Sequence, residues 1–217
     1  MRICFSLFFP VSCPIPVSSH GIVKKFLFIL FFLCAGANFL AAQQPENGPE
    51  ADGHDIAIWT GGGHSVPGGR GDTGAWNAGL RYGWIITNPH GPGFLKGRFE
   101  YALDAIPMFL IFQPANTAYG AGFNPVNLNW TLATRGSFAP YAELSGGVLF
   151  TNHDVPTGTN SVNFMPSIAV GTHILGEKYH WSVEVRYLHI SNAGLSVPNP
   201  GINTVQVRLG IGRFSKR

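Results

Sequence analysis

Apolar and polar side chains alternate with a period of two through most of the chain beyond residue 55. Successive side chains of a β-strand point to opposite faces, so this period is typical of strands with one apolar and one polar face. The chain is only 12% charged and poor in helix formers, which argues against a coiled coil or a helical bundle. The pattern predicts eight strands, near residues 55–62, 76–86, 98–105, 126–132, 141–150, 164–174, 181–187 and 205–211.

Two all-β architectures have this alternation: a soluble sandwich with its apolar face buried, and an outer-membrane barrel with its apolar face in lipid. Opposite charges share the polar face of single predicted strands, as Glu184 and Arg186 do, and would neutralise one another inside a barrel. Tryptophan and tyrosine lie at strand ends, where the aromatic girdles of membrane barrels lie. A soluble lipocalin-like carrier is disfavoured, because it would not fill its interior with charged side chains.

The predicted connections between strands alternate in length. Longer ones are expected near 63–73, 113–120, 153–160 and 192–201, and shorter ones near 88–93, 135–139 and 176–179. Extracellular loops and periplasmic turns of small barrels alternate in this way. No segment beyond the N-terminal leader is apolar for long enough to form a transmembrane helix. Strands that cross a membrane must have all their backbone groups hydrogen-bonded to other strands, which requires closure of the sheet into a barrel. We therefore expect an all-β, eight-stranded antiparallel outer-membrane β-barrel.

Residues 1–42 have the order of a secretory signal, with basic residues, then an apolar run, then small residues. We interpret them as an upstream extension plus a signal peptide, with a start near Val23. A short polar linker (43–54) and the β-barrel (55–217) would follow. The alternative is a retained anchor helix, for which the apolar run is short. We expect the protein in the bacterial cell outer membrane.

Removal of the leader would leave a near-neutral chain without cysteine. The 14 Lys and Arg include three in residues 1–42, so 11 would remain against 11 Asp and Glu. All three cysteines lie in the leader, so no disulfide is expected. A neutral chain without basic clusters argues against nucleic-acid binding. The histidines are scattered, and we expect neither a metal nor a cofactor. The glycine-rich residues 61–74 are predicted to include a flexible extracellular loop.

The segment after the seventh predicted strand carries candidate catalytic residues. His189 and Ser191 are two residues apart, so both would project from one face of a strand, and that face is the predicted lipid face. Asn203 opens the same face of the last strand, across the intervening loop from His189. A serine nucleophile, a histidine base and a third residue that orients the histidine are the groups used in acyl transfer. The alternative is a polar collar at the membrane interface.

The motif His189-x-Ser191-Asn192-Ala193-Gly194, followed by Pro198-Asn199-Pro200-Gly201, resembles the PagL-type lipid A 3-O-deacylases, which are outer-membrane esterases also filed as acyloxyacyl hydrolases. The resemblance is sharpest over about 25 residues and is otherwise one of architecture. It implies hydrolysis of the acyl ester at the 3-position of lipid A in lipopolysaccharide, with release of a 3-hydroxy fatty acid. No cofactor is implied.

The resemblance also implies roles for individual residues. Ser191 would be the nucleophile and His189 its base, and Asn192 and the Gly194 backbone would be candidate oxyanion donors. The family has a glutamate fourteen residues after the histidine, where this chain has Asn203. Asparagine can orient the imidazole but cannot stabilise its charged form. The outcome would be a slower enzyme, a working Ser-His-Asn variant, or an inactive relative.

A second function class is therefore a catalytically silent outer-membrane barrel with a structural or adhesive role. The expected partners of the first class are lipid A and the membrane itself, and the sequence leaves a homodimer open.

Overall fold

The computed structural model describes residues 48–215 of the chain. The predicted signal peptide and the start near Val23 lie outside the described residues, so both stay predictions. The boundaries of the described strands are β1 (His54–Ser65), β2 (Gly74–Ile85), β3 (Gly97–Phe112), β4 (Thr117–Leu132), β5 (Phe138–Thr151), β6 (Val162–Phe164), β7 (Ser167–Leu175), β8 (His180–Ile190) and β9 (Ile202–Ser215). A 3-10 helix, η2 (Gly93–Leu95), lies between β2 and β3.

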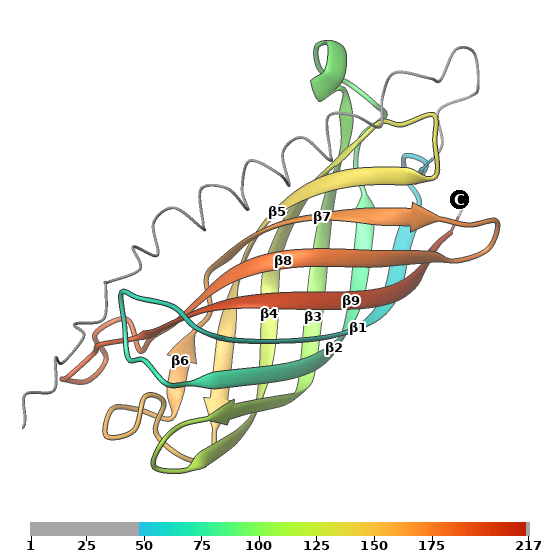
Figure 1. Cartoon of the computed structure of the whole chain (residues 1–217). Helices are drawn as coiled ribbons and strands as arrows, with labels where there is room; N and C mark the ends of the chain where they lie inside the picture. Colours follow the sequence, from blue (N-terminus) through green and yellow to red (C-terminus); the bar gives the residue numbers. More distant parts are fainter. Residues whose placement is uncertain (1–47, 216–217) are drawn as a thin grey trace, which may run out of the picture. The chain divides into compact units, whose positions relative to one another are not determined.

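These strands form a closed antiparallel barrel (Figure 1). Consecutive strands pair with each other except β6 and β7, and β9 pairs with β1 to close the ring. The short β6 and the longer β7 both pair with β5, at successive stretches of it, and are separated only by Met165 and Pro166. They are two parts of one barrel strand, so the eight-stranded barrel predicted from the alternation is confirmed.

The connections lie alternately at the two ends of the barrel. The end with the connections 66–73, 113–116, 152–161 and 191–201 is called the distal end here. The terminal end carries the start of β1, the end of β9 and the connections 86–96, 133–137 and 176–179.

The predicted alternation of connection lengths is wrong. The connection expected at 113–120 spans only 113–116, because β4 begins at Thr117. Glycines at inward positions of this stretch, Gly120 and Gly122, resemble a turn signal in sequence. Glycine is needed at position 120 inside the barrel, since a Cβ there would clash with the Phe150 carbonyl oxygen. The connection expected at 88–93 spans 86–96 and includes η2.

The outer face of the barrel is apolar, as the alternation predicts. On β8 the side chains of Trp181, Val183, Val185 and Tyr187 are exposed, whereas Glu184 is buried. Twelve buried hydrophobic residues form a cluster that includes Phe109, Ile190 and Ile202, and Ile190 and Ile202 lie at the distal ends of β8 and β9. The apolar side chains inside the distal half support the strand ends from which the loops leave.

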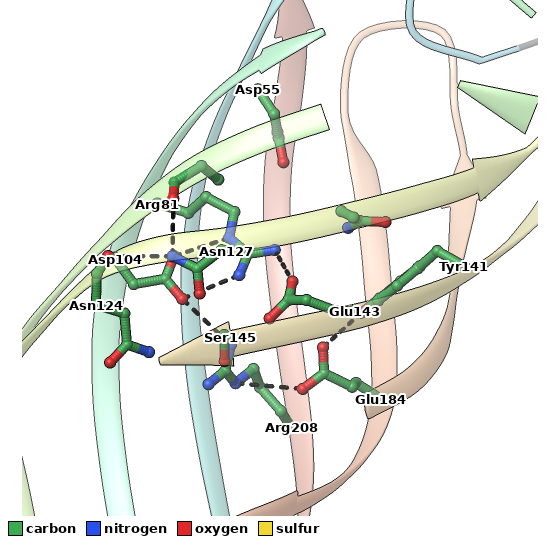
Figure 2. Close-up of polar contacts among 12 residues, drawn as sticks. Asp55, Arg81, Asp104, Asn124, Asn127, Tyr141, Glu143, Ser145, Glu184 and Arg208 are labelled. Carbon is green, nitrogen blue, oxygen red and sulfur yellow. Dashed lines mark hydrogen bonds and ion pairs between the residues drawn. The ribbon is translucent and has the colours of Figure 1, made fainter. Parts of the chain in front are cut away.

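A charged network spans the middle of the barrel interior (Figure 2). Arg81 of β2 makes a two-pronged ion pair with Asp104 of β3, at 2.8 and 2.9 Å, and reaches Glu143 of β5 at 2.6 Å. From the other side Arg186 pairs with both Glu143 and Glu184. Buried charges are stable only when paired in this way. The network fills the barrel at this level and leaves no room there for the ligand of a lipocalin-like carrier.

No helix among residues 48–215 is both long and apolar enough to cross a membrane.

Candidate active site

His189 and Asn203 lie opposite each other on the adjacent strands β8 and β9. Their neighbours on the same face, Tyr187 and Val205, are each 41% exposed, so this pair belongs to the outer surface of the barrel. The ring atom Nδ1 of His189 lies 2.6 Å from Asn203 Oδ1. The other ring nitrogen, Nε2, lies 2.9 Å from Ser191 Oγ, just beyond the end of β8. The three side chains therefore form one continuous hydrogen-bonded row.

The acceptor on Asn203 decides where the imidazole carries its proton. A carboxamide oxygen can only accept a hydrogen bond, so Nδ1 of His189 is the donor in this pair. Nε2 then has its lone pair free to accept from the Ser191 hydroxyl. This is the tautomer in which histidine can remove the proton of a serine nucleophile.

Backbone pairing holds Ser191 in place after β8 ends. The Phe164 N–H donates to the Ser191 carbonyl at 2.7 Å, and the Ser191 N–H donates to the Phe164 carbonyl at 3.2 Å. The His189 N–H donates to the Pro166 carbonyl at 3.0 Å. The short β6 thus continues the sheet past the break at Met165 and Pro166, which fixes Ser191 although it lies at the edge of a loop.

Gly201 allows the loop 191–201 to pack on the imidazole of His189. Its φ is +64°, a region that favours glycine, and a Cβ there would lie 2.8 Å from the His189 Cε1 atom. Gly201 belongs to the sequence motif, but the sequence alone does not show its role. Its position after two prolines and an asparagine was the available signal, because such a cluster marks a turn.

The connection 66–73 covers Asn203, which sequence reasoning missed. The Val66 N–H donates to the Asn203 carbonyl and the Arg70 N–H donates to the Gly201 carbonyl, both at 2.8 Å. Gly68 has φ +111°, and a Cβ on it would lie 2.8 Å from Asn203 Nδ2. The segment predicted as a flexible loop is therefore anchored on the site. Its glycines allow this close approach, and Asn203 is 5% exposed beneath it.

The two candidate oxyanion donors have other partners in this structure. The Gly194 N–H donates to Asn192 Oδ1 at 2.8 Å, and Asn192 Nδ2 donates to Ser196 Oγ at 2.9 Å. The Asn192 N–H donates to Asn199 Oδ1 at 3.2 Å. Asn192 and Gly194 thus stabilise the turn that follows Ser191. To act as oxyanion donors, Asn192 and Gly194 would have to break these hydrogen bonds and donate to the substrate oxygen instead.

Glu184, the nearest acidic residue on the strand, faces the barrel interior and is 2% exposed. It pairs with Arg186 at 2.7 Å and so does not replace the missing carboxylate at position 203.

Two histidines that looked scattered in sequence meet near the terminal end of the lumen. His173 and His180 approach at 3.2 Å between their Nδ1 atoms, and His180 Nε2 lies 2.9 Å from Asp55 Oδ1. Within the described residues no group of three or more His, Cys, Asp or Glu side chains could hold a metal ion.

A family model and the crystal structure of a known outer membrane enzyme agree with this architecture. A family model described as lipid A 3-O-deacylase (PagL) matches residues 76–212, which include His189, Ser191 and Asn203. The crystal structure of the outer membrane enzyme PagL superposes with a TM-score of 0.53 at 22% identity, covering 72% of this chain and 97% of that chain. Neisserial surface protein A superposes with a TM-score of 0.49 at 11% identity, covering 77% of this chain and 99% of that chain. No curated protein matches the chain.

Proposed function

The chain belongs to the PagL family of lipid A 3-O-deacylases, and we propose that it is an esterase that hydrolyses the 3-position acyl ester of lipid A with Ser191 as nucleophile. Family and fold indicate that the barrel lies in the bacterial outer membrane. The observation that carries the proposal is the hydrogen-bonded row Ser191–His189–Asn203 on the outer face of the barrel.

The reaction would proceed in two steps through an acyl-enzyme. His189 Nε2 takes the hydroxyl proton as Ser191 Oγ attacks the ester carbonyl, and the resulting imidazolium gives that proton to the departing 3-oxygen of the sugar. Water then attacks the acyl carbonyl while His189 accepts one of its protons, and His189 returns that proton to Ser191 Oγ as the ester bond to the serine breaks. The products are the 3-hydroxy fatty acid and the deacylated sugar. No step needs a second copy of the chain.

Asn203 would hold the imidazole in the productive tautomer through its carbonyl oxygen. It cannot add the charge stabilisation that a carboxylate gives to the imidazolium. We therefore infer a working Ser-His-Asn arrangement that is slower than the same site with a carboxylate.

The position of the site suits a membrane substrate. His189 and Ser191 continue the exposed apolar row of β8 at the distal end. With both ends of the barrel chain on the periplasmic side, as in other small barrels, the distal end meets the outer leaflet, where lipid A lies. The nucleophile then lies at the end of the barrel that meets lipid A.

The test is mass spectrometry of lipid A from cells that express the wild type, Ser191→Ala or the control Ser137→Ala. Ser137 is an exposed serine of the terminal connection 133–137, so its loss removes a hydroxyl far from the site. We expect wild type and Ser137→Ala to remove one 3-hydroxyacyl group, and Ser191→Ala to remove none. Equal deacylation by Ser191→Ala, with all three barrels inserted in the outer membrane, would refute the role of Ser191.

A catalytically silent structural or adhesive barrel is the second candidate function. Asn203 in place of the family glutamate is the observation that favours it. Intact lipid A in cells that hold well-inserted wild-type barrel would support this second candidate.

A further inference from the structure

Among the described residues, Arg70 is the only Lys or Arg in the four connections of the distal end. The arginines of β2, β3, β8 and β9 that lie in the lumen are buried. The remaining described cations belong to the terminal end, namely Lys96, Arg135, Lys178 and Arg213. A negatively charged substrate that reaches the distal end therefore meets a single Lys or Arg side chain in the described connections of that end.

The backbone of Arg70 is fixed beside the candidate active site. Its N–H donates to the Gly201 carbonyl at 2.8 Å, and Gly201 packs on the imidazole of His189. The loop is also tied at its base, where the Ser65 N–H donates to the Thr73 carbonyl and the Thr73 N–H donates to Ser65 Oγ. Arg70 is thus held near the imidazole of His189 by backbone contacts that do not depend on its side chain.

The Arg70 side chain is exposed and makes no ion pair with any described residue. Two acidic residues share the distal connections, Asp72 of the same loop and Asp154 of the connection 152–161. Neither forms an ion pair within the described part of the chain. The guanidinium is therefore available to a ligand, in contrast to those of Arg81 and Arg186 in the lumen, which pair with neighbouring carboxylates.

We propose that Arg70 is an anion-binding residue of the substrate site and holds a phosphate group of the lipid A headgroup while Ser191 attacks the acyl ester. This inference rests on the proposed function. Lipid A is an acylated glucosamine disaccharide that carries phosphate groups, so ester and phosphate lie close together on one headgroup. A guanidinium matches phosphate oxygens with two parallel hydrogen bonds, and such charge-assisted bonds are about twice as strong as neutral ones.

The experiment compares three substrates with purified full-length barrel in detergent: phosphorylated lipid A, the same lipid A after phosphatase treatment, and an uncharged short-chain p-nitrophenyl ester. We expect Arg70→Gln to lower kcat/KM on phosphorylated lipid A by about tenfold, chiefly through KM, and to leave the other two substrates unchanged. Arg70→Lys should recover part of the loss, because it keeps the charge but not the two-pronged geometry. Lys178→Gln, which removes a charge at the terminal end, is the matched control. An equal loss on all three substrates, or no loss on phosphorylated lipid A, would overturn the proposal.

Binding to Ser191→Ala separates this inference from the proposed function, since it needs no turnover. Ser191→Ala should bind phosphorylated lipid A about tenfold more tightly than dephosphorylated lipid A, and Ser191→Ala with Arg70→Gln should lose that preference. If the wild type hydrolyses nothing but the preference is seen, the proposed function fails and Arg70 keeps its role. If hydrolysis is seen without any phosphate preference, the role of Arg70 fails and the esterase stands.

Discussion

At the scale of single residues, the site depends on which atom of residue 203 faces the imidazole. The carbonyl oxygen of Asn203 accepts a hydrogen bond from His189 Nδ1 at 2.6 Å, so the neutral amide can orient the imidazole as the family glutamate would. It carries no negative charge with which to stabilise the imidazolium. The residue is 5% exposed, and the connection 66–73 lies against it through the hydrogen bond from the Val66 N–H to the Asn203 carbonyl.

Two substitutions at this position separate the orienting and electrostatic roles. Asn203→Leu removes the acceptor and should lower kcat on an uncharged ester by about a hundredfold, because the imidazole loses its fixed tautomer. Asn203→Asp keeps the size and the acceptor, adds charge, and should raise kcat by about tenfold. The measurement is steady-state kinetics of the detergent-solubilised barrel.

Asn88 of the terminal connection 86–96 provides the matched controls, Asn88→Leu and Asn88→Asp, since it is exposed and distant from the site. An Asn203→Leu variant as fast as the wild type would mean that residue 203 does not orient His189.

At the scale of elements, three segments that are distant in sequence assemble the site. The β8–β9 pair sets His189 against Asn203, β6 pairs with Ser191, and the connection 66–73 packs over Asn203 and Gly201. The contact of the connection 66–73 exists because β1 pairs with β9, which brings the first hairpin of the barrel beside the last. The loop acts as a cover that restrains the third member of the row.

Two glycines of this loop test that role. An alanine at Gly68 would be strained at φ +111° and its Cβ would press on Asn203 Nδ2, whereas a Cβ at Gly71 meets nothing within 4 Å. We expect Gly68→Ala to lower kcat on an uncharged ester by about tenfold and to destabilise the barrel by about 1 kcal/mol. Gly71→Ala should change neither quantity. Activity assays and denaturant unfolding on the two variants check this, and an equal effect of both substitutions would contradict it.

At the scale of the whole molecule, the barrel is held rigid by charges that meet across its interior. Glu143 of β5 accepts from Arg81 of β2 (Figure 2) and also from Arg186 of β8, so one carboxylate links three strands of the ring. Such ties keep the strand ends in register, and the hydrogen-bonded row at the distal end depends on that register. The same charges also exclude an open pore at this level.

Removal of the Glu143 carboxylate should therefore destabilise the folded barrel. Glu143→Ala leaves two buried guanidinium groups short of a partner, and we expect a loss of about 3–5 kcal/mol in the free energy of unfolding. Glu177→Ala, at an exposed acidic residue of the turn 176–179, should change it by less than about 0.5 kcal/mol. Urea unfolding of the barrel in lipid vesicles measures both. A Glu143→Ala barrel as stable as the wild type would show that the charged network does not stabilise the fold.

The sequence by itself determined the strands, the face that each presents and the serine-histidine pair, because side-chain alternation is a property of neighbouring residues. Residues 181–191 alone place His189 on the outward-facing side of β8 and Ser191 at the next position of the same parity, just beyond the end of the strand. The alternation did not predict the first part of β4, where glycines stand at inward positions. Glycine has no side chain, so the sequence does not show which face of the strand such a position belongs to. Only the tertiary structure decided that Gly68 lies on Asn203, that β6 holds Ser191, and that Arg70 stands beside the site. These contacts follow from closure of the ring between β1 and β9, and no local pattern encodes which distant loops closure brings together.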